Sequence, residues 1–197
     1  MELSRKYLVD MEIAKNLLRR LGKWEYLGLC LLVLVILAMH FSIIMQPDVV
    51  VFDEQYYVDD ARSILQGDDT LRPEHPPLGK LFVVLGMFLF GDNPLGWRFF
   101  SVLFGAVCIV LFYLICRRLA MPKEASFLAT FLLALENLSF VQAGIAMLDV
   151  YSVTFMLLSF WLYLRGQYVL SGVSVALSAL ASLLVDWHFL SYCCTGC

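Results

Sequence analysis

The sequence predicts an all-α integral membrane protein with about five transmembrane helices and a long extracytoplasmic first loop. Of its 197 residues, 61% are hydrophobic and only 16% are charged, and the mean hydropathy is +0.79. Soluble domains are nearer half apolar and a quarter charged. This composition excludes a soluble enzyme and a disordered chain, and the net charge of −3 leaves no basic surface for nucleic acid.

The transmembrane helices are predicted from apolar stretches that approach the length needed to cross a bilayer, about 20 residues. The predicted spans are 26–46, 97–116, 124–142, 149–164 and 168–184. Short connections join the last three, so we expect them to be antiparallel neighbours in a helical bundle.

Charge predicts the orientation of the chain. Residues 1–25 have helical spacing of apolar side chains with basic residues between them, which fits a cytoplasmic surface helix on anionic lipid or an exposed lead-in helix. The apolar stretch 81–90 is too short to cross, so we expect it to lie at the membrane surface. Arg117 and Arg165 are then also cytoplasmic, and residues 47–96 form one extracytoplasmic loop.

This first outer loop contains nine of the seventeen acidic residues, which is typical of a functional segment rather than a connector. Asp53 and Glu54 follow an apolar run just beyond the first span. A partly desolvated carboxylate there can act as a general base toward a hydroxyl. The pair also fits the acidic start of a helix that begins near Glu54.

Further polar residues flank the predicted membrane surface. The sequence His75-Pro-Pro-Leu-Gly-Lys80 predicts a stiff turn followed by a helix start. The side chains of His75 and Lys80 could contact a phosphate headgroup there, or the turn is structural and Lys80 extends to water. Arg98 suits a phosphate contact or an interfacial anchor. Glu136 lies within an apolar stretch, which marks a candidate site, and Asp149 opens a helix and suits a cap.

The order of these motifs resembles the protein O-mannosyltransferase family of the glycosyltransferase C superfamily, over about residues 24–184. The resemblance rests on an outer Asp-Glu, the His-Pro-Pro-Leu-Gly-Lys motif, Trp-Arg-Phe-Phe-Ser at the second span, Leu-Glu-Asn and Leu-Asp. Family members are much longer, so the chain resembles an N-terminal part, which we expect to be inactive alone.

The resemblance implies transfer of mannose from a polyprenyl phosphate to Ser or Thr hydroxyls of proteins, with inversion at the anomeric carbon. It implies that Asp53 is the base, that Glu54 positions acceptor or base, and that Arg98 lies near the lipid phosphate. His75 and Lys80 belong to a motif that shapes the site. It implies no cofactor and no metal, although the acidic loop could hold a divalent cation.

Two other functions stay open: a lipid-linked sugar transferase with a lipid or glycan acceptor, such as an aminoarabinose transferase, and a non-catalytic membrane scaffold. The chain could also form an oligomer. A cell membrane is favoured over the endoplasmic reticulum. Residues 185–197 form an atypical tail in which His188 and three cysteines could bind zinc, or which is a non-native end of the reading frame.

Overall fold

The computed structural model describes residues 26–73 and 75–182, and every regular element in them is a helix. An N-terminal helix, Tyr26–Ile43, is followed by seven more. These are α2 (Glu54–Gln66), α3 (Pro77–Phe90), α4 (Pro94–Arg118), α5 (Lys123–Ala134), α6 (Asn137–Gly144), α7 (Asp149–Leu164) and α8 (Tyr168–Ala181). The predicted fold class, an all-α membrane protein, is confirmed. The predicted N-terminal surface helix and the tail 185–197 lie outside the described residues.

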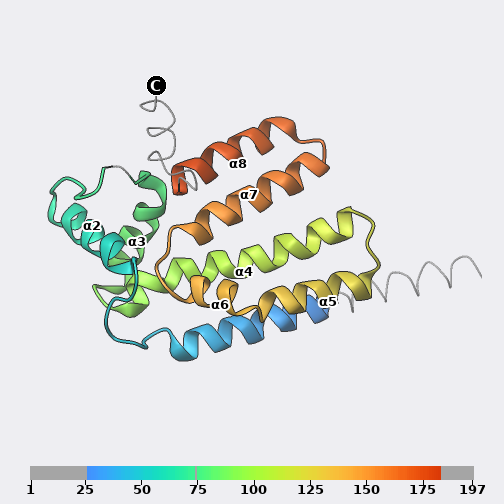
Figure 1. The fold of residues 1–197 in the computed structure, drawn as a ribbon, viewed down its shortest axis with the longest axis horizontal. Helices are drawn as coiled ribbons and strands as arrows, with labels where there is room; N and C mark the ends of the chain where they lie inside the picture. Colours follow the sequence, from blue (N-terminus) through green and yellow to red (C-terminus); the bar gives the residue numbers. More distant parts are fainter. Residues whose placement is uncertain (1–25, 74, 183–197) are drawn as a thin grey trace, which may run out of the picture.

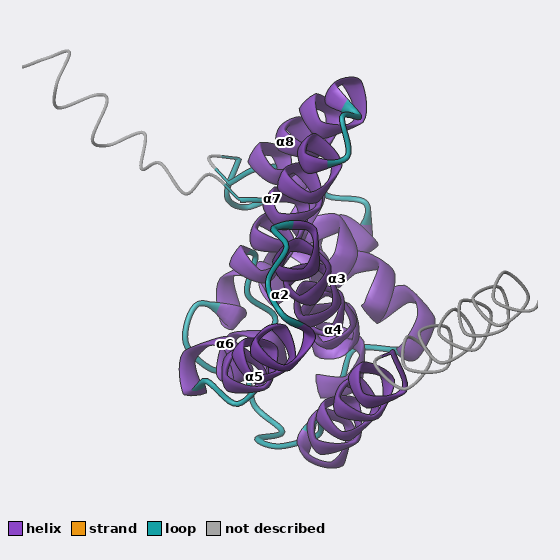
Figure 2. Ribbon diagram, turned by 90° about the vertical axis from the view of Figure 1, so that its right-hand side faces the viewer, coloured by secondary structure: helices purple, strands orange, loops and turns teal. Residues whose placement is uncertain are grey.

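The long helix α4 is the centre of the bundle, as Figure 1 shows. It packs against α3, α5, α6 and α7, and α7 packs in turn on α8. The N-terminal helix lies beside α5 on the side of the bundle away from α8. Figure 2 shows the same bundle from the side, with helices throughout and only short connections between them.

Helix length distinguishes the elements that can cross a bilayer. The N-terminal helix has 18 residues and α4 has 25, and both are apolar enough to span. The predicted span 124–142 is broken into α5 and α6, bent by 59°, and counts as a third span only if the pair is taken together. The helices α7 and α8 match the last two predicted spans but have 16 and 14 residues, fewer than a full span.

The break between α5 and α6 explains why Glu136 is not an isolated carboxylate in a helix. Its side chain caps α6 by accepting hydrogen bonds from the backbone N–H groups of Leu138 and Ser139, at 3.0 and 2.7 Å. His40 stacks on Phe140 of α6 and its ring nitrogen lies 3.0 Å from the Phe140 carbonyl oxygen. These contacts attach the N-terminal helix to the bend.

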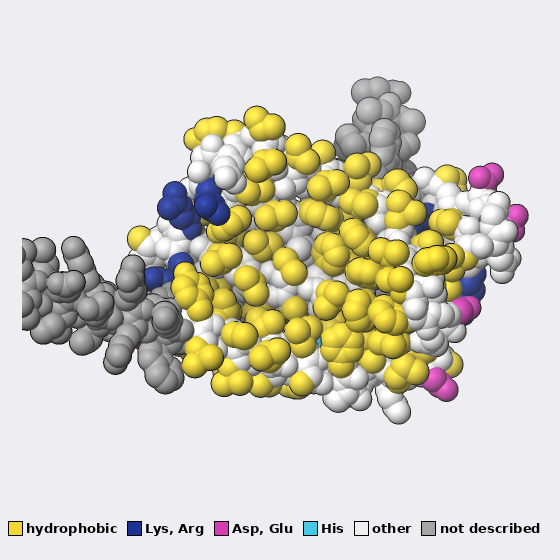
Figure 3. Space-filling model, turned by 180° about the vertical axis from the view of Figure 1, so that it is seen from behind, with side chains coloured by type: hydrophobic (Ala, Val, Ile, Leu, Met, Phe, Trp, Pro, Cys, Tyr) yellow, Lys and Arg dark blue, Asp and Glu magenta, His cyan; other side chains and the backbone are white. Residues whose placement is uncertain are grey.

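The segment between the N-terminal helix and α4, which was predicted to be the first outer loop, is a folded cap on one end of the bundle. It carries α2 and α3, and α3 packs on both α2 and α4. With 14 residues, α3 is an apolar helix shorter than a full span, as are α7 and α8, so its predicted place at the membrane surface stays a prediction. Figure 3 shows a broad apolar surface with acidic and some basic side chains at the cap end, and with Lys and Arg at the opposite end.

Candidate active site at the outer cap

Asp53 lies exposed at the N-terminal end of α2, immediately before Glu54. The helix starts where the capping interpretation placed it, but the Asp53 side chain makes no capping hydrogen bond. Its carboxylate is therefore open to an incoming group. The preceding residue, Phe52, has a positive φ of 51° and is 77% exposed. A bulky residue in this conformation costs about 1–3 kcal/mol and must be held by its surroundings.

Glu54 and Arg98 supply that support through a fully buried ion pair. The carboxylate accepts from Arg98 Nε and Nη2, both at 2.8 Å, and from the backbone N–H groups of Val51 and Ala146. The guanidinium also donates to the carbonyl oxygens of residues 44, 47 and 49. One ion pair thus joins the end of the N-terminal helix, the turn before α2, α4 and the chain that enters α7.

This geometry leaves Arg98 and Glu54 nothing to offer a substrate. All five N–H groups of Arg98 are occupied, and both side chains are fully buried. The resemblance implied that Arg98 lies near the lipid phosphate. In the structure its guanidinium is instead occupied by Glu54 and by backbone carbonyl oxygens. It makes both residues structural supports of the segment that presents Asp53.

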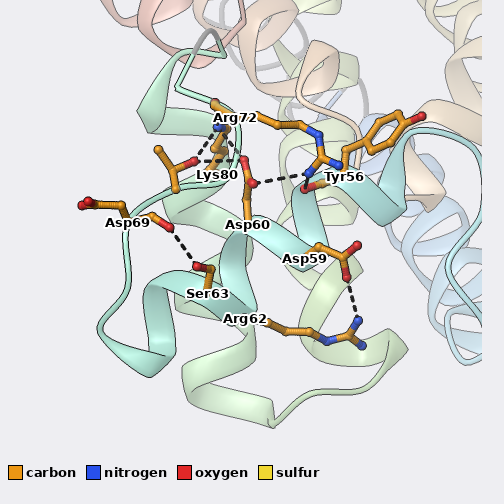
Figure 4. Close-up of polar contacts among 9 residues, drawn as sticks. Tyr56, Asp59, Asp60, Arg62, Ser63, Asp69, Arg72 and Lys80 are labelled. Atoms are coloured by element: carbon orange, nitrogen blue, oxygen red, sulfur yellow. Dashed lines mark hydrogen bonds and ion pairs between the residues drawn. The ribbon is translucent and has the colours of Figure 1, made fainter.

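Lys80 is also buried, contrary to both sequence interpretations. Its ammonium pairs with Asp60 at 2.6 Å and donates to Thr70 Oγ1 at 2.9 Å and to the Arg72 carbonyl oxygen. Figure 4 shows this cluster between α2, α3 and the connecting loop. The side chain that was expected to reach a headgroup or water instead fixes α2 against α3.

Three of the predicted site residues, Asp53, His75 and Asp149, lie near Tyr57, which is one helical turn after Asp53. His75 is half-buried and meets the Tyr57 ring edge-on, with centroids 5.7 Å apart. Desolvation, together with the nearby carboxylates of Asp53 and Asp149, raises the pKa of Tyr57 to about 12, and the charge of Arg72 opposes this rise. Asp149 begins α7 and accepts a hydrogen bond from Ser182 Oγ at 3.1 Å.

The structure thus brings His75 against Tyr57 and places Asp53 and Asp149 near the same phenol, while Arg98 and Lys80 are held in buried ion pairs. Glu136 belongs to the α5–α6 bend and has no described contact with this cluster. Sequence reasoning missed Tyr57, although its i+4 spacing from Asp53 places the two on one helical face. Within residues 26–73 and 75–182, no three His, Cys, Asp or Glu side chains are grouped to hold a metal ion.

Comparison with known proteins identifies relatives of the chain. The profile of the dolichyl-phosphate-mannose-protein mannosyltransferase family matches residues 90–185. A polyprenol-phosphate-mannose–protein mannosyltransferase of Mycobacterium tuberculosis is 30% identical over 178 residues, which cover 86% of this chain and 34% of that protein. The chain belongs to the protein mannosyltransferase family.

Other members of the family and its neighbours are also similar. The enzyme of the same name from Mycolicibacterium smegmatis is 34% identical over 116 residues, covering 56% of this chain and 22% of that protein. An undecaprenyl phosphate-alpha-4-amino-4-deoxy-L-arabinose arabinosyl transferase of Pseudomonas paraeruginosa is 33% identical over 105 residues, covering 49% of this chain and 19% of that protein. No solved structure matches the chain significantly. The chain spans about a fifth to a third of the length of these relatives.

Proposed function

We propose that this chain supplies the base-bearing part of a membrane glycosyltransferase that transfers mannose, or a related sugar, from a polyprenyl phosphate to Ser or Thr hydroxyls of proteins. The single observation that supports it most is the exposed Asp53 carboxylate, presented by a turn that the buried Glu54–Arg98 pair holds. The names of the mycobacterial relatives supply the donor and acceptor classes.

The proposed reaction is a single displacement with inversion. The acceptor hydroxyl oxygen bonds to the anomeric carbon while the bond from that carbon to the phosphate oxygen breaks. The Asp53 carboxylate takes the hydroxyl proton, and polyprenyl phosphate leaves with the electron pair. Because this leaving group is already a weak base, one general base and a cation near the phosphate are sufficient.

The position of the cap suits a lipid-linked donor. Figure 3 shows acidic side chains at one end of a broad apolar surface, and Asp53 lies exposed at the start of α2 in the cap. A prenyl chain buried in the bilayer would carry its phosphate to this level. We place the site on the extracytoplasmic face of a cell membrane, because the basic end of the bundle is the cytoplasmic one under the positive-inside rule.

The test is a pair of substitutions in the native gene, D53N and D48N. Asp48 is an exposed carboxylate in the same outer segment, so its variant controls for loss of charge. We expect D53N to lower mannosylation of secreted proteins by at least about a hundredfold, as loss of a general base does, and D48N to leave it unchanged. Intact-mass spectrometry of secreted proteins measures the outcome, with membrane levels of each variant checked by immunoblot.

Equal mannosylation in D53N and the parent would reject Asp53 as the base. The arabinosyl transferase relative favours a second candidate, transfer to a lipid acceptor. Membranes offered a Ser/Thr peptide and a lipid acceptor in parallel separate the two. Transfer to neither acceptor, with secreted proteins unchanged on gene deletion, would favour the scaffold.

A further inference from the structure

We propose that Arg72 is the side chain that contacts the phosphate of the polyprenyl donor. This inference rests on the proposed function and names the cation that the reaction requires. The lysine and arginine side chains of the outer segment, residues 44–98, differ in what their N–H donors already contact.

The other three cations are occupied. Arg98 is fully buried with all five N–H groups bonded, and Lys80 is 2% exposed and held by Asp60 and Thr70. Arg62 donates from Nε and Nη2 to Asp92, at 2.8 and 3.1 Å, and from Nη1 to Asp59. A phosphate would have to displace one of these carboxylates.

Arg72 differs because most of its donors are unused. Nη1 donates to the Tyr56 carbonyl oxygen at 3.2 Å and to Asp60 at 3.4 Å, and Nε and Nη2 have no described partner. The side chain is 28% exposed and stacks over the Tyr56 ring at 4.4 Å, as Figure 4 shows. Stacking holds a planar guanidinium with its free edge available for bidentate contact with phosphate.

The backbone of Arg72 is anchored, so the side chain starts from a fixed point. Its carbonyl oxygen accepts from the buried Lys80 ammonium and from the His75 backbone N–H. Its guanidinium stacks on Tyr56, whose backbone N–H donates to the Asp53 carbonyl oxygen at 3.0 Å. The cation and the proposed base therefore share one surface of the cap, and the Lys80–Asp60 pair positions the cation.

The reaction needs a cation at this point. The donor phosphodiester carries one negative charge, and the departing polyprenyl phosphate carries two once the bond to the anomeric carbon has broken. A guanidinium fixed beside the phosphate oxygens interacts more strongly with the departing phosphate than with the phosphodiester. Because the second negative charge develops in the transition state, the guanidinium stabilises the transition state more than the bound donor.

The experiment measures binding of a C55 polyprenyl monophosphate, with the matching polyprenyl alcohol as reference, to the native protein in lipid nanodiscs. We expect R72Q to lower affinity for the monophosphate by about tenfold, as loss of charge-assisted hydrogen bonds does, and to leave affinity for the alcohol unchanged. R72K retains the charge and should lose less. The matched control, R62Q, removes a cation from the same helix cap and should bind like the parent.

The outcomes are distinguishable. A parent protein that binds monophosphate and alcohol equally would overturn the proposed donor class, and with it the proposed function. A parent that prefers the monophosphate, with R72Q unchanged or with R62Q equally weakened, would overturn the assignment of Arg72 alone. Circular dichroism and thermal unfolding establish that each variant is folded. If R72Q does not fold, R72K is compared with the parent in its place.

Discussion

Arg98 shows how a buried side chain can fix the position of an exposed one, here Asp53. Its guanidinium ties the chain on either side of Asp53 to α4, and its partner Glu54 ties that chain to Ala146, in the connection that enters α7. Burial of two charges costs several kcal/mol and is offset only when every hydrogen-bonding group is satisfied. In the described residues no buried side-chain nitrogen or oxygen lacks a partner. We infer that the pair serves geometry more than stability.

Removal of one member of the pair is therefore expected to be costly. R98M leaves the Glu54 carboxylate buried without its counter-ion, and we expect it to lower the free energy of unfolding by about 3–5 kcal/mol. The double variant E54L/R98M removes both charges and should recover part of that loss. Thermal unfolding in detergent measures both.

The control for this prediction is R118M, which removes an exposed arginine with a single backbone contact, to the Leu164 carbonyl oxygen. It should leave stability within about 0.5 kcal/mol of the parent. An R98M protein as stable as R118M would show that the pair is dispensable.

At the scale of the element, the close approach of α3 and α4 determines where the cap sits. A Cβ at Gly86 would collide with the carbonyl oxygen of Gly96, and the obstacle is backbone rather than a movable side chain. The absence of side chains at these two positions lets the turn after α3 place the start of α4 against it. Arg98, one turn into α4, reaches Glu54 because of this contact.

We expect G86A to separate α3 from α4 and to lower the free energy of unfolding by about 1–3 kcal/mol, as overpacking does. Gly172 of α8 provides a matched control, because a Cβ there meets nothing within 4 Å. G172A should be neutral or stabilising by up to about 1 kcal/mol, since alanine is the better helix former. Unfolding midpoints of the two variants are compared directly, and a shift of both in the same direction would contradict the close-packing argument.

At the scale of the whole molecule, the separation of charge defines two ends. The cap with α2 and α3 lies at one end of α4, and Arg118, Lys123 and Arg165 belong to the connections at the other. From Arg98 to Arg117 the helix rises about 28 Å at 1.5 Å per residue. This is close to the thickness of a hydrocarbon core, about 30 Å, so the two ends can lie on opposite sides of one bilayer.

Cysteine labelling tests this arrangement. In a background whose native cysteines are replaced, we expect D48C to react with a membrane-impermeant maleimide on intact cells. R118C should react only after permeabilisation, since both parent side chains are exposed but at opposite ends. Labelling of both positions from the same side would overturn the orientation and the extracytoplasmic site together.

The amino-acid sequence determined the class of protein and the order of its motifs, because a bilayer selects for length and apolarity, and both are local properties of the chain. It also placed Asp53 at the start of a helix. Only the tertiary structure decided what each charged residue contacts. Arg98 and Glu54 are 44 positions apart, and Asp60 and Lys80 are 20 apart, so no local pattern shows that these pairs are buried. The electrostatic cost of an unpaired buried charge brings such groups together. Among the described residues of the cap, Asp53 and Arg72 are a carboxylate and a guanidinium that keep unused bonding capacity.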